Sequence, residues 1–417
     1  MHLAFRAQAF GPLNRVDWTV PPGVSAIVGP NRAGKSTLLA LPEFIRISID
    51  SSVNDAVKQL FGGTAYFRNL NAPATSSPGV GLSVETVAWD IDITIAAGAI
   101  APLCAEQLKR DDRVVFSRAF GSSEGKDDSD VKRISLGPRV LPAICSETAQ
   151  QILEQKPEVF ARDNKKTFTL SDLEFLEKSQ IPQLLVDILA GSWLASTSIH
   201  FASYRTYNYR IQHLLRYGST HSSDTALERS GENVFPLLRN WRDDSETEHR
   251  FDFVISTLRE AFPHVKRLDF EQAGDTVTMM IRDRRWPDRK IPISRESTGL
   301  ITALLQLCAV ASCKRGGMVT IDELETSLHP HAIRVLIAAF RRWATEHDLR
   351  IVLATQSETV LDQFHDDPGQ IYVIEPKQET SPRSLTDMFD AEYLAQFSLG
   401  DLFSHLEFGS NGDLDVE

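Results

Sequence analysis

Apolar residues alternate with polar ones along two stretches of the N-terminal third. Residues 16–20 and 87–95 carry an apolar side chain at every second position. A period of two is typical of a strand that turns one face to the core and one to solvent, as in antiparallel sheets. Two shorter apolar runs, 114–116 and 131–136, flank a polar turn and predict two more strands. We therefore expect an antiparallel layer within the first 145 residues.

The pattern becomes helical in the middle of the chain. Residues 146–194 show helical spacing, and Ser171 to Glu174 forms a capping box ahead of an apolar run. Residues 251–262 again place apolar side chains at helical intervals. A short apolar run at 198–203 predicts a strand within this largely helical part. No heptad repeat is sustained, so a long coiled coil is not expected.

Continuous apolar runs return in the C-terminal third. Residues 318–321, 351–354 and 371–374 have the length and composition of strands that are buried on both faces of a parallel sheet. A helix over 330–345 separates the first two, and a similar apolar run lies far upstream at 24–28. We expect these distant segments to share one sheet. The fold class is therefore α/β, with a mixed parallel sheet, an antiparallel layer and a helical insertion.

The same patterns divide the chain into three segments. We expect an N-terminal lobe over 1–145, a mainly helical insertion over 146–265 and a C-terminal lobe over 266–417. The longest apolar run, 299–313, is too short to span a bilayer and predicts a buried helix. No membrane association is expected.

The composition bears on the cellular location of the protein and on its possible partners. The 417 residues include four cysteines without metal-type spacing, which indicates a reducing, cytoplasmic location and no structural zinc. The N-terminus leads straight into strand-like sequence, so no signal peptide is expected. The net charge of −12 repels nucleic acid, so any contact with DNA needs a local patch or a partner.

The segment Gly29 to Thr37 reads GPNRAGKST and lies between an apolar strand and a helix-forming run. This strand–loop–helix context predicts a phosphate-binding loop for a nucleoside triphosphate. Lys35 would reach the β- and γ-phosphates of ATP, and Ser36 would hold Mg²⁺. The predicted nucleotide-binding residues are Gly29, Asn31, Ala33, Gly34, Lys35, Ser36 and Thr37.

Two carboxylates follow the apolar run at 318–321. Asp322 and Glu323 would lie at the carboxyl end of a buried strand, where ligand sites form in α/β sheets. Asp322 would bind Mg²⁺ through water, and Glu323 would polarise the attacking water. Together with the phosphate-binding loop, the pair predicts an ATPase.

Three further segments resemble known ATPases. Glu296 to Gly299, followed by an apolar helix, looks like the signature motif of ABC-class ATPases. Asp322 to Pro330 is similar to the acidic strand and D-loop of the OLD-like (overcoming lysogenisation defect) and RecF-like ATPases, and Thr355 to Ser357 takes the position of their switch motif. The resemblance covers most of the chain, with residues 50–195 matched by pattern alone.

This resemblance implies an ABC-type P-loop core whose copies pair head to tail. Ser297 and Gly299 would then complete the partner's nucleotide site in trans, and Ser327 and His329 would belong to the D-loop. Read by itself, the Ser-Thr-Gly segment is an ordinary helix N-cap. Its spacing of 23 residues from Gly299 to Asp322 matches the family layout and favours the signature interpretation.

The chain departs from the ABC pattern at two points. Gln356 stands where many ABC ATPases carry histidine, and an amide can donate to the γ-phosphate but cannot take up a proton. We still count Gln356 with Lys35 and Glu323 as catalytic, and expect slow turnover. No glutamine can be assigned to sensing Mg²⁺. His329 next to His331 could also suggest a metal site, but the D-loop explains His329 without one.

Arginines and aromatic residues interleave from Tyr204 to Arg210. Arg205 and Arg210 are therefore candidates for a nucleic-acid patch, because such composition suits stacking on bases. The same composition also suits a packed face near the nucleotide, and we favour this structural interpretation.

The resemblance implies an ATP-driven switch that forms a homodimer or a higher even oligomer. Relatives without a Toprim nuclease domain occur in prokaryotic anti-phage defence systems, so a separately encoded effector, such as a nuclease, or DNA is the expected partner. An acidic C-terminal stretch supports a protein partner. The alternative is an ATP-dependent scaffold that assembles a partner complex and hydrolyses little.

Overall fold

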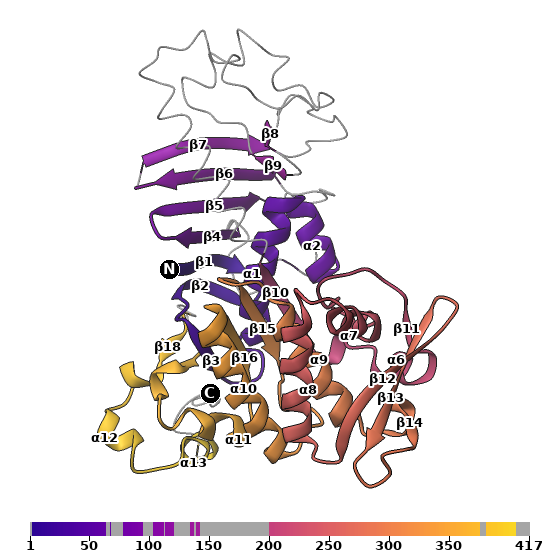
Figure 1. The fold of residues 1–417 in the computed structure, drawn as a ribbon. Helices are drawn as coiled ribbons and strands as arrows, with labels where there is room; N and C mark the ends of the chain where they lie inside the picture. Colours follow the sequence, from indigo (N-terminus) through magenta and orange to yellow (C-terminus); the bar gives the residue numbers. More distant parts are fainter. Residues whose placement is uncertain are drawn as a thin grey trace. The chain divides into compact units, whose positions relative to one another are not determined.

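The computed structural model describes residues 2–63, 67, 78–94, 103–111, 113–120, 134–136, 139–141, 200–375 and 381–405. The chain forms two compact units (Figure 1). The first comprises Met1–Val20, Arg32–Ile199 and Pro376–Ser381, and the second comprises Pro21–Asn31, His200–Glu375 and Pro382–Glu417.

The first unit contains an antiparallel sheet with strand order β2-β1-β4-β5-β6-β7. Every neighbouring pair is antiparallel, as the alternating sequence pattern predicts. Helix α1 packs on β1 and β4, and α2 follows α1 (Figure 1). The elements are β1 (Leu3–Phe10), β2 (Leu13–Thr19), α1 (Lys35–Asp50), α2 (Val53–Phe61), β4 (Gly79–Val84), β5 (Val87–Thr94), β6 (Leu103–Arg110) and β7 (Arg113–Phe120).

One face of this sheet is its core. Trp18 and Trp89 point to it and are buried, whereas their sequence neighbours are more exposed. Phe10 packs edge-on against Phe44 and Phe67, with ring centroids 5.0 and 5.3 Å apart. Aromatic pairs in this geometry contribute about 0.5–1.5 kcal/mol beyond their buried area. The period of two thus identified the buried face correctly.

A second hairpin of the first unit pairs β8 (Ile134–Leu136) with β9 (Arg139–Leu141). Strand β8 covers the second half of the strand that we predict over 131–136. The polar turn before it, the predicted helices over 146–194 and their capping box at Ser171 lie outside the described residues.

The second unit is built around a largely parallel sheet with order β10-β15-β16-β3-β17-β18. Only the β17–β18 pair is antiparallel. The N-terminal strand β3 lies between β16 and β17, which confirms that distant segments share one sheet. The strands are β3 (Gly23–Val28), β10 (Phe201–Arg205), β15 (Met318–Asp322), β16 (Arg350–Ala354), β17 (Ile371–Val373) and β18 (Arg383–Ser384).

Helices cover this parallel sheet. Helix α10 (Pro330–His347) packs on β3 and β16, and α9 (Thr298–Ser312) packs on β15. Helix α9 is buried from Gly299 to Ser312, so the apolar run forms the buried helix that we expect. Helix α8 (Glu248–Ala261) packs against α7 (Val234–Asp243), α9 and α10. In the described ranges, no helix is both long and apolar enough to cross a bilayer.

The second unit is completed by a small antiparallel sheet and by short helices. The sheet order is β11-β13-β12, with β14 on β13. Its strands are β11 (Ser219–Thr220), β12 (Val265–Ala273), β13 (Thr276–Asp283) and β14 (Lys290–Pro292). The short helices are η3 (Thr206–Asn208), α6 (Ile211–Tyr217), η4 (Ile293–Arg295), α11 (Glu358–Leu361), η5 (Asp362–Phe364), η6 (Pro368–Gln370), η7 (Leu385–Asp387), α12 (Ala391–Leu394) and α13 (Leu399–Ser404).

The α/β fold class is confirmed by these two sheets and their helices. Strand β10 confirms the short strand that we expect near 198–203, shifted toward Arg205. The three-segment division at 145 and 265 stays a prediction, because residues 142–199 lie outside the described part.

Candidate nucleotide site

Three motif segments leave the parallel sheet of the second unit at the same edge. Asp322 at the end of β15 pairs with Ala354 of β16, which pairs with Ile27 of β3. The strands are parallel, so the loops that follow them begin side by side (Figure 1). These loops carry the acidic pair, the switch motif and the start of the phosphate-binding loop.

The switch residue Gln356 connects two of these loops. Its side-chain Nε2 donates to Oδ1 of Asn31, 2.7 Å away in the phosphate-binding loop. Its backbone N–H donates to Oε1 of Glu325 at 3.0 Å. Both predicted residues, Asn31 and Gln356, are exposed at this edge. The structure therefore brings together residues that are 325 positions apart in the chain.

Glu325 is a further member of this network, and from the sequence it is only the second candidate, after Glu323, for the catalytic carboxylate. Burial is the main cause that raises the pKa of its carboxyl, partly offset by the hydrogen bond from the Gln356 N–H. The available signal was a second acid three residues after Asp322, on a loop already identified as acidic. A half-buried carboxylate beside the predicted switch residue thus ties the two loops together.

Asp322 and Glu323 have opposite environments. Asp322 is 4% exposed at the strand end, whereas Glu323 is exposed. Glu323 has φ of 58°, a left-handed conformation that costs a residue with a Cβ about 1–2 kcal/mol. Its N–H still donates to the Ala354 carbonyl at 3.0 Å, which holds the turn against β16. The turn thus leaves Asp322 buried and Glu323 exposed.

The predicted signature lies against the D-loop of the same unit. Ser297 caps α9, because its Oγ accepts from the Leu300 N–H at 3.3 Å. A Cβ added to Gly299 would overlap the carbonyl oxygen of Ser327, whose own φ is 64°. Glycine is therefore required at position 299 for packing within the chain. The role of both residues in trans stays a prediction.

His329 caps α10. Its Nδ1 accepts from the His331 N–H at 3.2 Å, and Pro330 occupies the first turn of the helix. His331 contacts the Glu260 carbonyl through Nε2 at 3.2 Å. His329 thus has a structural role as the N-cap of this helix.

The second half of the phosphate-binding loop belongs to the first unit. Gly34 precedes α1 with φ of 99°, and a Cβ there would lie 2.6 Å from Cδ2 of Leu13. No side chain caps the N-terminus of α1, which begins at Lys35. Ala33 is buried, and Ser36 and Thr37 are half-buried. A left-handed glycine before an uncapped helix start is compatible with anion binding, and the role of these residues in binding phosphate stays a prediction.

The candidate nucleic-acid patch has mixed surroundings. Arg205 ends β10 and pairs in register with Asp322. Arg210 is exposed and donates to Glu232 at 3.1 Å. Tyr204 of the same run is buried, and its hydroxyl donates to the Leu227 carbonyl at 2.9 Å. Part of the run is therefore structural, and nucleic-acid binding stays a prediction.

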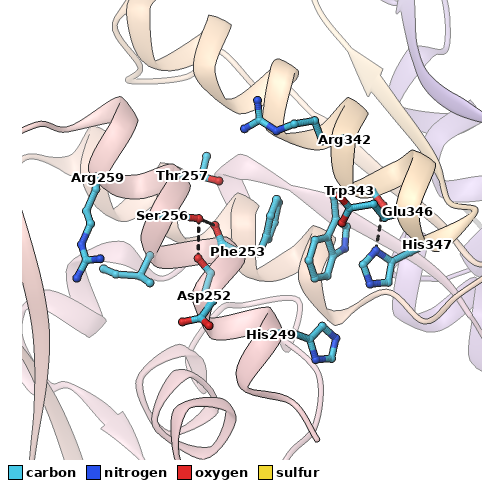
Figure 2. A pocket seen from close by; sticks show the side chains of 11 residues that line it. His249, Asp252, Phe253, Ser256, Thr257, Arg259, Arg342, Trp343, Glu346 and His347 are labelled. Carbon is cyan, nitrogen blue, oxygen red and sulfur yellow. Dashed lines mark hydrogen bonds between the residues drawn. The ribbon is translucent and has the colours of Figure 1, made fainter. Parts of the chain in front are cut away.

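A pocket of about 530 Å³ lies between α8 and α10 (Figure 2). None of the predicted site residues lines it. Its wall is a stack of rings in which Trp343 lies 4.2 Å from Phe253 and 3.9 Å from His347 between ring centroids. The pocket is thus separate from the sheet edge that carries the motifs.

The sequence matches a known protein family. The family model described as "AAA domain, putative AbiEii toxin, Type IV TA system" matches residues 149–362, just over half of the chain. The chain belongs to this family. The matched range of this AAA-domain protein includes the predicted signature, acidic pair, D-loop and switch, and excludes the predicted phosphate-binding loop. Membership supports nucleotide binding and ATPase activity.

Solved structures give distant matches. An SmcHead bound to the C-winged helix domain of ScpA matches with a TM-score of 0.44 and 12% identity, over 93% of this chain and 99% of that one. The SMC head domain from Thermotoga maritima matches with a TM-score of 0.39 and 13% identity, over 92% and 99%. A third, an Smc head domain bound to a ScpA domain derived from Pyrococcus furiosus, gives 0.41 and 13%, over 94% and 99%. No curated protein matches this AAA-domain protein.

Proposed function

We propose that this protein is an Mg²⁺-dependent ATP hydrolase that works as a dimeric switch. The observation that carries the proposal is the shared sheet edge, where Gln356 donates to Asn31 and Glu323 follows β15. Glu325, through the Gln356 N–H, holds the same edge together. Family membership supports the ATPase class of activity.

Each residue of the site has a role that its environment suits. The hydroxyl of Ser36 would be an oxygen ligand of Mg²⁺, and the carboxylate of Asp322 would bind the ion through water. The accessible carboxylate of Glu323 would accept a proton from the attacking water. Lys35 would balance the charge of the β- and γ-phosphates, and the Gln356 amide would donate to the γ-phosphate. Bound ATP and Mg²⁺ supply the phosphoryl group and the charge that polarises it.

We further propose that two copies pair head to tail, as a homodimer or a higher even oligomer. Ser297 and Thr298 are exposed at the start of α9, a buried helix of 15 residues. Such a helix start attracts an anion, so the γ-phosphate of a second copy is a suitable partner. The site of each copy would then be complete only in the dimer.

Subunit mixing tests this pairing. Ser297→Arg chains and Lys35→Ala chains should each be inactive, because each spoils both sites of a homodimer. A mixed dimer has one intact composite site, so ATP turnover should return on mixing. Ser294→Arg, at an exposed serine in η4, is the matched control and should keep turnover. Inactive mixtures in which differently tagged chains co-purify would contradict completion in trans.

We propose that the switch controls a separately encoded effector, for which a nuclease is the leading candidate. The net charge of −12 opposes extended contact with a nucleic acid. A weak, salt-sensitive contact with DNA through Arg205 and Arg210 is compatible with this negative net charge. The family description refers to a toxin–antitoxin system, which supports a partner encoded nearby and a role in defence. Purification of this protein together with the products of neighbouring genes, with and without ATP, would identify the effector. ATP turnover too low to measure would favour the scaffold alternative.

A further inference from the structure

Thr206 lies next to the acidic pair but belongs to none of the motifs. It begins η3, directly after β10, and it is 4% exposed. Its hydroxyl Oγ1 lies 2.9 Å from the backbone carbonyl oxygen of Asp322 and 3.1 Å from that of Glu323. One side chain therefore contacts the backbone of both the predicted metal-binding Asp322 and the predicted catalytic Glu323, from a position 116 residues away from Asp322.

The chemistry of this contact is specific to a hydroxyl. A threonine Oγ1 carries one proton, so the two carbonyls share it in a bifurcated hydrogen bond. The carbonyls belong to successive residues on either side of the turn from the strand into the left-handed conformation of Glu323. Fixing both orients two successive peptide planes. The Cα–Cβ direction of Glu323 is then set, because it depends on those planes.

Other contacts hold the same loop. The Glu323 N–H donates to the Ala354 carbonyl, and Nε2 of the fully buried Gln306 donates to the Leu324 carbonyl at 2.9 Å. Side chains from two other elements thus capture the three successive carbonyls of Asp322, Glu323 and Leu324. Among these side chains, Thr206 alone contacts the backbone of Asp322 and Glu323 in the described structure. The Glu323 carbonyl also accepts from the Thr326 N–H at 3.2 Å, so the buried contact that depends on Thr206 is the one to the Asp322 carbonyl. A buried carbonyl that loses a donor is costly, so without the Thr206 hydroxyl the peptide plane between Asp322 and Glu323 would shift to recover one.

We propose that Thr206 is a positioning residue for ATP hydrolysis, which sets the orientation of the Glu323 carboxylate through the backbone. This inference rests on the ATPase function proposed above. Thr206 does not touch the nucleotide in this account. Its loss should therefore slow the chemical step and leave ATP affinity unchanged.

The test compares Thr206→Val with Thr206→Ser. Valine keeps the shape and removes the hydroxyl, whereas serine keeps the hydroxyl. In Thr206→Val, kcat should fall about 10- to 100-fold, as small misplacements of a reacting group do, with unchanged Kd for ATP. Thr206→Ser should stay within about threefold of wild type, since its hydrogen bonds are retained. Thr206→Ala, a second hydroxyl-free variant, should behave like Thr206→Val and covers the case in which valine prevents folding.

A double variant separates positioning from general damage. If Thr206 acts through Glu323, then Thr206→Val should not slow the residual hydrolysis of Glu323→Gln any further. Wild-type kcat in Thr206→Val, equal loss in the valine and serine variants, or a parallel loss of ATP affinity would each overturn the inference. Absence of turnover in the wild-type protein would instead refute the proposed function itself.

Discussion

Asp322 and Glu323 are adjacent in the chain, yet the turn at Glu323 gives them different chemistry. The strand end keeps Asp322 buried, which suits a metal ligand, and the left-handed φ of 58° brings Glu323 to the surface. The identity of both residues and their strand end could be predicted from sequence. The supports from Thr206, Gln306 and Glu325 could not, because they are contacts between side chains and backbone across more than 15 positions. No local pattern encodes such contacts.

Glu325 should make stability depend on pH. Its raised pKa means that the folded state holds the proton more tightly than the unfolded state does. The resulting stabilisation is complete below the unfolded value, near 4.5, and decreases as pH rises through the folded value. Glu325→Gln has no titrating carboxyl at this position and does not lose stability in this way. Its free energy of unfolding relative to wild type should therefore rise as pH goes from 4 toward neutrality. Urea unfolding at several pH values measures this, and a difference that is independent of pH would contradict the assignment.

At the scale of elements, the order of strands determines the site. The apolar runs at 24–28, 318–321 and 351–354 predicted three buried strands, and all three are present as β3, β15 and β16. Their neighbours could not be predicted, because pairing β3 beside β16 joins segments more than 300 residues apart. The alternating N-terminal pattern was more informative, since neighbouring hairpin strands pair with each other.

The contact between α8 and α10 provides a test at this scale. Trp343 is 5% exposed and stacks on Phe253 and His347, so Trp343→Ala should lower the free energy of unfolding by about 3–5 kcal/mol. His249→Ala removes an exposed ring at the end of the same stack, 5.9 Å from the Trp343 ring between centroids (Figure 2), and should cost much less. ATP turnover per folded molecule should be unchanged in both, because none of the predicted site residues lines this pocket. Chemical denaturation measures the predicted change in stability, and turnover assays measure the activity. Equal stability of the two variants would mean that the stack contributes little.

For the whole molecule, the family match and the predicted phosphate-binding loop cover different parts of the chain. The family match begins at residue 149, so it does not include the phosphate-binding loop. That loop was identified from its own pattern, and its halves fall in the two units that the chain connects at Asn31 and Arg32.

The central claim is that Glu323 activates water for ATP hydrolysis at the edge of the parallel sheet. Steady-state ATP turnover with Mg²⁺, measured for wild type and Glu323→Gln, tests it most directly. We predict that wild type hydrolyses ATP, that Glu323→Gln loses about 10²- to 10⁴-fold in kcat, and that it keeps ATP affinity. Glu346→Gln, at an exposed acid on α10, should retain the wild-type rate. Wild-type turnover in Glu323→Gln would contradict the account.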